Sequence, residues 1–313
     1  MVDNLLLVGT QVFVLFILIG LGYFGGKIKL LNKSGVKCMN DVMLYFVTPC
    51  VIINVFQREF DKKMLANLLL SMVASMIAHV VAYLLALLFV RNKDESKGAI
   101  LRFGAVFSNC GFMALPLIEA LLGDEGLFYA AGYLAVFNIC VWTFGQYIMS
   151  KGKGDFSLKK AFLNPGVIAV AIGLVMFFTS CTLPQVIGSP IAFLSELNTP
   201  VPMLIIGYTI STIDLKELIK IKELVPSLVI RLVFTPLLVL LALYLIGVRD
   251  VLLVASIVSA STPVAAITTM FAIKFDADEK LASKLVAVST LFSLVTMIVI
   301  VAVTSYLSGG QLA

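Results

Sequence analysis

Two runs of sequence interrupt long hydrophobic stretches: Ser108-Asn109-Cys110-Gly111-Phe112-Met113-Ala114-Leu115-Pro116, within residues 107–122, and Ser259-Ala260-Ser261-Thr262-Pro263, within residues 258–272. Asn109 and Thr262 are residue types that cap helix N-termini, and Pro263 suits the first helical position. We therefore expect a half-helix to begin in each stretch. Broken helices in corresponding places of two halves indicate the binding site of a secondary transporter. The alternative is a pair of proline kinks.

The composition places the chain in a membrane. Hydrophobic residues make up 60% of the 313 residues, charged residues make up 13%, and the mean hydropathy is +1.06. Soluble domains are about 45–50% apolar. The N-terminal residues 1–4 contain no Lys or Arg, so we expect the first apolar run to remain as a helix rather than to be a signal peptide. The sequence predicts an all-α polytopic membrane protein without a separate soluble domain.

Ten membrane spans are predicted from the apolar runs. They are residues 5–26, 37–57, 64–90, 98–122, 126–149, 163–180, 190–211, 222–247, 250–273 and 281–307. Of the 23 Lys and Arg residues, 18 lie in alternate connections, while the other connections and the termini hold four. By the positive-inside rule, we expect both termini to be outside. We expect the membrane to be the cell inner (plasma) membrane. The basic residues are spread out, so no nucleic-acid partner is expected.

Three sets of residues recur in order at nearly constant spacing. They are Thr48-Pro49 and Thr199-Pro200, 151 apart; Asn109 and Thr262, 153 apart; and Asp124-Glu125 and Asp278-Glu279, 154 apart. We therefore expect a first five-helix repeat over 1–150, a cytoplasmic connection over 151–162 and a second repeat over 163–313. Because five spans per half is an odd number, the second repeat would be inverted.

Three ionisable residues inside the spans are candidates for charge neutralisation or coupling. His79 and Arg231 are 152 apart, each near the middle of a span. A central Arg costs at least about 2.5 kcal/mol on insertion scales, so it should face the interior and have a partner. We expect Arg231 to neutralise substrate or Glu119 and His79 to exchange a coupling proton. The alternatives are a satisfied core histidine for His79, and an interfacial rather than a buried titrating carboxylate for Glu119.

Prolines and glycines mark further positions. Each proline inside a span removes a backbone donor and frees a carbonyl one turn earlier. We therefore predict hinges at Thr48, Pro49, Thr199, Pro200 and Pro202. Gly22-x-x-x-Gly26 is a helix-packing motif common in membrane proteins.

The chain resembles the auxin efflux carrier family of the bile acid and auxin carrier superfamily, as a bacterial member. The resemblance covers nearly the whole chain, and its most specific parts are residues 109–116, Leu204-Ile205-Ile206-Gly207, Pro263 and Val288-Ser289-Thr290-Leu291-Phe292-Ser293. It implies ten helices in two inverted repeats, spans 4 and 9 unwound where they cross, an elevator-like motion, and recognition of a carboxylate by Asn109. Ala114 departs from a common glycine, and the short connection 150–162 lacks the long loop of many plant relatives. Bacterial relatives are usually described as permeases of malate, malonate or similar acids.

These observations predict a carrier of small organic anions. The expected substrate-binding residues are Asn109, Gly111, Pro116, Ser261, Thr262 and Pro263. Helix N-termini bind anions without a lysine. Expected partners are a small carboxylate, the lipid bilayer, a coupling proton or sodium ion, and a second copy in a homodimer.

An intramembrane enzyme is disfavoured, because the sequence has no HExxH motif, no second His and no pair of buried aspartates. The five cysteines show no CxxC spacing, so we expect neither a disulfide nor a metal site, and no cofactor. A passive channel or a membrane sensor on the same fold stays open as an alternative.

Overall fold

The computed structural model describes residues 2–151, 162–212 and 221–308, and these residues are almost entirely helical. The elements in the first half are α1 (Val2–Lys27), α2 (Lys33–Val42), η1 (Met43–Val47), α3 (Thr48–Phe56), α4 (Lys62–Phe89), α5 (Glu95–Val106), η2 (Cys110–Ala114), α6 (Leu115–Cys140), η3 (Val141–Gly145) and α7 (Gln146–Met149). Those in the second half are α9 (Pro165–Thr179), α10 (Gln185–Ser195), η4 (Glu196–Asn198), α11 (Pro200–Ser211), α12 (Val225–Val229), η6 (Ile230–Phe234), α13 (Thr235–Leu245), α14 (Asp250–Ser261), α15 (Ile267–Lys274) and α16 (Glu279–Leu307). The predicted connection over 151–162 lies almost wholly outside the described residues.

Six helical stretches among the described residues are long and apolar enough to cross a membrane. They are Lys33–Phe56, Lys62–Phe89, Cys110–Met149, Gln185–Ser211, Val225–Leu245 and Glu279–Leu307, and shorter apolar helices accompany them. The 12-residue helices α5 and α14 fall short of the roughly 20 residues that one crossing needs. Within the 40-residue stretch, Gly123 has a φ of 59° and separates two helical parts of α6. The structure agrees with a polytopic membrane protein, while the ten-span repeat stays a prediction.

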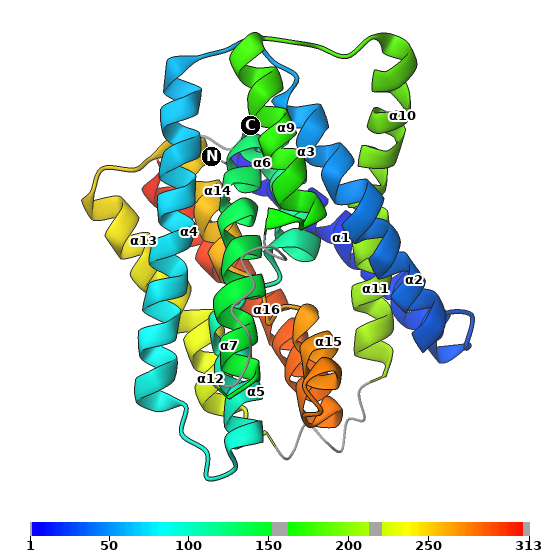
Figure 1. The fold of residues 1–313 in the computed structure, drawn as a ribbon, viewed down its shortest axis with the longest axis vertical. Coiled ribbons are helices and arrows are strands. Elements are labelled where there is room, and N and C mark those ends of the chain that lie inside the picture. Colours follow the sequence, from blue (N-terminus) through cyan, green and yellow to red (C-terminus); the bar gives the residue numbers. More distant parts are fainter. Residues whose placement is uncertain (1, 152–161, 213–220, 309–313) are drawn as a thin grey trace.

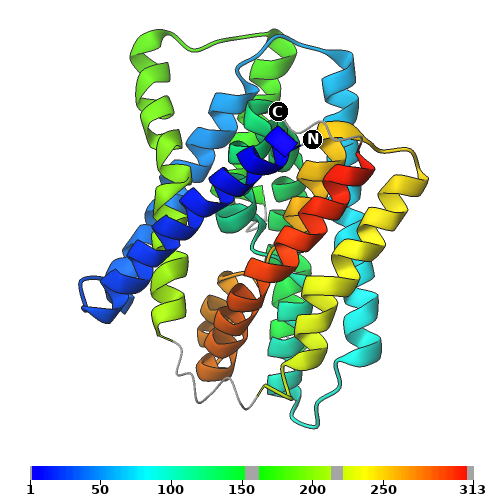
Figure 2. The same ribbon diagram turned by 180° about the vertical axis from the view of Figure 1, so that it is seen from behind.

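The helices form two packing groups, and each group draws on both halves of the chain (Figures 1 and 2). In the first packing group, α1 packs along α11 and α3 packs against α9 and α10. In the second packing group, α4 and α14 pack against α6, and α16 packs against α14, α15 and α5. The two groups meet where α6 contacts α3 and α9, and where α16 contacts α11.

The close contact between α1 and α11 depends on glycines. A Cβ on Gly22 would overlap the carbonyl of Leu204, and one on Gly207 would overlap the carbonyl of Ile19. Both obstacles are backbone atoms, which cannot rotate away. The absent side chains therefore let the two helix backbones approach closely, as small residues do in membrane helix pairs.

Widened helical turns precede several prolines. The π-helical turns η1, η2 and η6 lie immediately before Thr48-Pro49, Leu115-Pro116 and Thr235-Pro236. A proline has no N–H to donate and its ring crowds the carbonyl one turn earlier, so the helix widens there. A 3₁₀ turn, η4, precedes Thr199-Pro200. The predicted hinges thus coincide with irregular turns, although movement about them stays a prediction.

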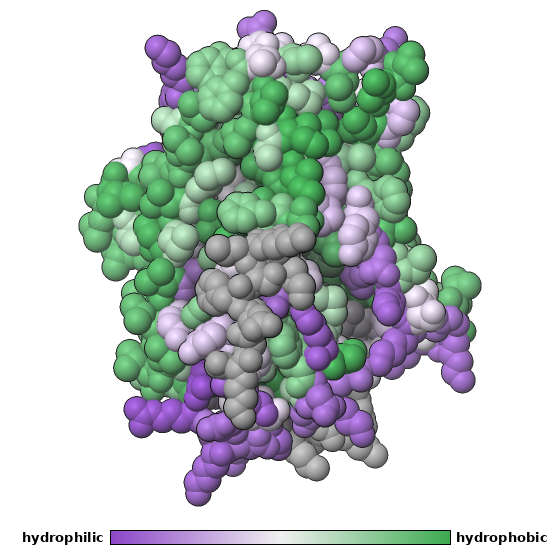
Figure 3. Space-filling model, viewed as in Figure 1, coloured by the Kyte–Doolittle hydropathy of each residue, from purple (hydrophilic) through white to green (hydrophobic). Residues whose placement is uncertain are grey.

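Hydrophilic residues gather at one end of the molecule. In Figure 3 they cover the lower end, whereas apolar residues cover most of the flanks. The α4–α5 loop, with Arg91 and Lys93, lies at this lower end, while α1 begins and α16 ends in the upper half of the views in Figures 1 and 2. This separation fits the predicted orientation, which the structure does not test.

Candidate functional site

The two predicted helix breaks lie side by side and pair with each other. Helix α5 ends at Val106 and α14 ends at Ser261. The Asn109 N–H donates to the Pro263 carbonyl at 2.8 Å, and the Ala265 N–H donates to the Phe107 carbonyl at 2.9 Å. These bonds form an isolated antiparallel bridge centred on Ser108 and Val264. The unwound backbones thus satisfy each other, as buried polar groups require.

The prediction that Thr262 caps a helix N-terminus and that Pro263 is its first residue is wrong. Thr262 instead ends α14, and its hydroxyl donates back to the Ser259 carbonyl at 3.1 Å. The proline ring disfavours a helical conformation in the residue before it, and Thr262 is extended with a ψ of 154°. The chain stays unwound until Ile267, where α15 begins.

We call the two paired unwound segments, residues 107–109 and 262–266, the crossover. A small cavity of about 80 Å³ adjoins the crossover. Its lining residues are Leu44, Thr48, Asn109, Gly111, Phe112, Leu134, Phe137, Asn138, Trp142, Asn164, Gly166, Ala265, Ala266 and Ile267. They come from both packing groups: η1, α3 and the start of α9 on one side, and the crossover with α6 and η3 on the other. None of them is acidic or basic. We take this crossover cavity as the candidate site.

Polar groups in the crossover cavity are free to bind a ligand. Asn109 and Asn138 are 8% and 7% exposed, and neither side chain has a hydrogen-bond partner among the described residues. The Thr48 hydroxyl is also buried and has no partner in the described part of the chain. Buried polar groups are normally hydrogen-bonded, so unpartnered ones around a cavity favour a ligand or ordered water.

Three helical segments begin at the crossover cavity. Asn109 precedes η2, Ala266 precedes α15, and Asn164 precedes α9. Asn164 caps α9, because its side-chain oxygen accepts from the Gly166 N–H at 2.9 Å. Helix N-termini carry partial positive charge and unpaired N–H groups. These segment starts therefore favour an anion in the cavity, although no cationic side chain among the described residues lines it.

The predicted substrate-binding residues are divided by the structure. Asn109 and Gly111 line the crossover cavity, whereas Pro116, Ser261, Thr262 and Pro263 do not. The Ser261 hydroxyl donates to the Val258 carbonyl of its own helix at 3.0 Å. Residues 265–267 line the cavity from the second break.

The predicted substrate-binding set did not include two asparagines, Asn138 and Asn164, or the aromatic residues Phe112, Phe137 and Trp142 of the cavity. Asn164-Pro165 matches the preferred residues for a helix cap and the first helical position, and this signal could have identified the start of α9. Asn138 is a polar residue within an apolar stretch, which is a weaker signal. Nothing in the sequence distinguishes Trp142 from a lipid-facing aromatic residue.

Arg231 lies on η6 and is 1% exposed. Its Nη1 donates to the Val106 carbonyl at 2.8 Å, and its Nη2 donates to the Ala260 carbonyl. It does not line the crossover cavity. The expectation that Arg231 has a buried partner therefore holds, with backbone carbonyls as the partners.

His79 packs against Phe107, the first residue of the unwound segment that follows α5. Its Nδ1 lies 2.7 Å from the Ser75 carbonyl, so Nδ1 carries the hydrogen, and Nε2 has no partner in the described part of the chain. Its ring centroid lies 5.5 Å from that of Phe107, the residue at which α5 gives way to the break. His79 is thus in contact with the crossover but not with its cavity.

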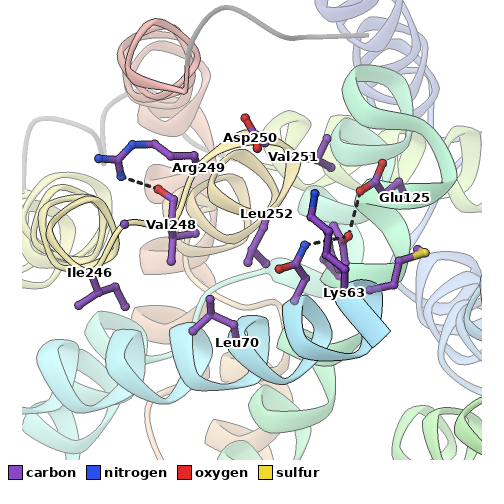
Figure 4. Close-up of a pocket in the computed structure, with 13 residues that line it drawn as sticks. Lys63, Leu70, Glu125, Ile246, Val248, Arg249, Asp250, Val251 and Leu252 are labelled. Carbon is purple, nitrogen blue, oxygen red and sulfur yellow. Dashed lines mark hydrogen bonds between the residues drawn. The ribbon is translucent and has the colours of Figure 1, made fainter. Parts of the chain in front are cut away.

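A larger cavity, of about 300 Å³, lies near the end of the molecule where α4 begins (Figure 4). Lys63, Glu125, Arg249 and Asp250 line it together with apolar residues. The Tyr129 hydroxyl on its wall donates to the Glu125 carboxylate at 2.9 Å. Lys63, Glu125 and Asp250 are exposed, so water screens their charges. The residues that line the crossover cavity are instead buried or half-buried, and none of them is charged.

Comparison with known proteins agrees with this architecture. The family model described as membrane transport protein matches residues 7–301. An uncharacterized transporter of Methanocaldococcus jannaschii is 22% identical over 296 residues, which are 91% of this chain and 95% of that protein. The family match covers nearly every described helix, including both breaks. The chain therefore belongs to the membrane transport protein family, which includes the auxin efflux carriers, and it is a transporter rather than an enzyme.

Proposed function

We propose that the protein is a secondary transporter of small organic anions, such as mono- or dicarboxylates, and that the crossover cavity binds the carboxylate. One observation carries this proposal. Three helical segments begin at a cavity that, among the described residues, is lined by three asparagines and by no charged side chain. Amide donors and helix N-termini together favour an anion, while an acidic residue in the wall would repel it.

The size of the crossover cavity favours a small substrate. Its volume of about 80 Å³ is well below the roughly 300–1,000 Å³ of pockets that hold drug-sized ligands. Phe112, Phe137 and Trp142 supply apolar walls that would strengthen electrostatic attraction by excluding water. These features support a short-chain acid over a large aromatic one.

An elevator-like mechanism is the transport mode that we propose. The cavity lies between the two packing groups, and each group combines elements from both halves of the chain. Movement of the second packing group, which carries the crossover, against the first would carry the ligand with it. We further propose ten spans in two inverted repeats, termini outside the plasma membrane, and assembly as a homodimer.

Transport by purified protein in liposomes tests this function. Malonate and malate are the first substrates to try, followed by monocarboxylates, with labelled anion outside and unlabelled anion inside. A carrier shows saturable uptake and counterflow, whereas a passive channel shows no counterflow and a sensor moves nothing. Absence of counterflow with every acid would refute the proposal.

The variant Asn109→Ala tests the location of the site. An unmet charged partner costs about 1.5–3 kcal/mol, so we expect affinity to fall roughly tenfold to a hundredfold. Asn92→Ala, in the α4–α5 loop, is the matched control and should bind normally. Normal binding by Asn109→Ala would show that the crossover only kinks the helix.

A further inference from the structure

Arg231 joins the ends of both broken helices. Val106, whose carbonyl accepts from Nη1, is the last residue of α5, and Ala260, whose carbonyl accepts from Nη2, is the penultimate residue of α14. Such carbonyls have no partner within their own helix, so another donor must satisfy them. One side chain thus completes two helix C-termini that come from distant parts of the sequence.

The charge of the Arg231 guanidinium balances the partial charges of the two helix C-termini. The C-terminus of a helix carries about −0.5 elementary charge, so two C-termini together carry about −1, which one guanidinium neutralises. Among the described residues, the recorded ion pair is Lys33–Glu279, and no carboxylate contacts Arg231. The counter-charge of Arg231 is therefore the pair of helix ends. Of the two predicted partners of Arg231, substrate or Glu119, the Glu119 carboxylate accepts hydrogen bonds from Asn198 and Thr199 instead.

The position that Arg231 occupies is one that suits a metal cation. In transporters with broken helices, unwound carbonyls and half-helix C-termini coordinate the coupling ion. Here both carbonyls already accept from Arg231, whose side chain is the largest fully buried one among the described residues. A sodium ion would have to displace a guanidinium that is covalently attached and always charged.

We propose that Arg231 is a tethered cation that takes the place of a coupling sodium ion at the crossover. The carrier then binds its anion without sodium at this position. Arg231 is a positioning residue, because it bonds to both helix ends and does not line the crossover cavity. The role of Arg231 in transport rests on the proposed function. Cation binding by the protein can be measured without any substrate.

Removal of the guanidinium should create a requirement for a free cation. Arg231→Ala leaves two unpaired helix ends and a space beside them, which sodium or guanidinium ion could fill. Arg231→Gln keeps a donor but no charge. Arg231→Lys keeps the charge and is the conservative control.

The test is the thermal unfolding midpoint of the purified protein in sodium chloride, in choline chloride, and with millimolar guanidinium chloride at matched ionic strength. We expect the wild type and Arg231→Lys to have the same midpoint in sodium and choline salts. Arg231→Ala and Arg231→Gln should unfold about 4 °C or more lower in choline, with saturable recovery in sodium or guanidinium.

Two results would overturn the inference. Saturable stabilisation of the wild type by sodium would show that a cation binds in addition to Arg231. Equal midpoints of Arg231→Gln in all three salts would show that Arg231 is only a structural anchor.

If Arg231→Ala does not fold, the measurements on the wild type, Arg231→Lys and Arg231→Gln still test the inference. If no organic anion is transported in any salt, the proposed function fails while these measurements stand.

Discussion

The Glu119 carboxylate of α6 accepts a hydrogen bond from the Thr199 hydroxyl at 3.1 Å, at the point where α11 begins. The same oxygen also accepts from the Asn198 amide at 3.1 Å. Glu119 belongs to the second packing group and its two partners belong to the first. This half-buried carboxylate therefore ties the two groups together beside a predicted hinge.

Replacement of Glu119 should weaken this link in graded steps. Glu119→Gln keeps an acceptor but loses the charge, which we expect to lower stability by about 1 kcal/mol. Glu119→Ala leaves both donors unpartnered and should cost more. Thermal unfolding of purified variants measures both effects, with the exposed Glu196→Gln as the matched control. Equal stability of all three variants would mean that the link contributes nothing.

The sequence predicted where the helices break but not how the breaks meet. Polar residues and prolines are local signals, and Asn109 and Pro263 do lie in the unwound segments. The bond from the Asn109 N–H to the Pro263 carbonyl joins residues far apart in the chain, and it helps to keep the second break open until Ile267. Local sequence propensities do not report such pairing. For this reason the predicted helix start at Pro263 was wrong, and α15 begins at Ile267 instead.

Only part of the candidate site was predicted from the sequence, because the rest is brought together by tertiary contacts. Asn109 and Gly111 were accessible to sequence reasoning because they sit in a break. Asn138 and Asn164 join them only through the packing of α6 against α9, which depends on tertiary contacts. The partners of Arg231 are backbone carbonyls, and carbonyls carry no residue-specific signal at all.

The α1–α11 contact should not tolerate a side chain at Gly207. A Cβ there would overlap the backbone of Ile19 and Tyr23, so Gly207→Ala must separate the helices, at a cost of roughly 1–3 kcal/mol. Gly20→Ala is the matched control, because a Cβ on Gly20 meets nothing within 4 Å. Thermal unfolding should show destabilisation of the first variant only. Equal midpoints would indicate that the helices separate without cost.

Orientation can be tested with the native cysteines. Cys181 and Cys38 are both exposed, and Cys181 lies in the α9–α10 connection, at the end that we predict to be outside. In single-cysteine variants on intact cells, an impermeant maleimide should label Cys181 and spare Cys38. Added cysteines at positions 313 and 153, both outside the described residues, should be labelled and spared respectively. The reverse pattern would overturn the positive-inside assignment and the proposed orientation together.

His79 remains the candidate for proton coupling, and its surroundings say what to expect. Nε2 is buried, the ring packs near Phe107, Tyr133 and Phe137, and no described residue offers Nε2 an acceptor, so this conformation suits the neutral ring. Protonation would then require another conformation, in which Nε2 finds water or an acceptor. A proton that binds in one conformation and leaves in the other is what coupling needs.

If His79 carries the proton, uptake should fall as external pH rises through the range in which imidazole loses its charge, ordinarily about 6.5. His79→Gln cannot titrate and should flatten this profile while uptake persists. Ser75→Ala perturbs the same helix turn by removing the hydroxyl that bonds to Tyr133, yet it keeps the carbonyl that holds Nδ1, so its profile should keep the wild-type shape. Reconstituted transport between about pH 5 and 8 gives the measurement. A pH profile of His79→Gln identical to that of the wild type would assign the coupling proton to another group.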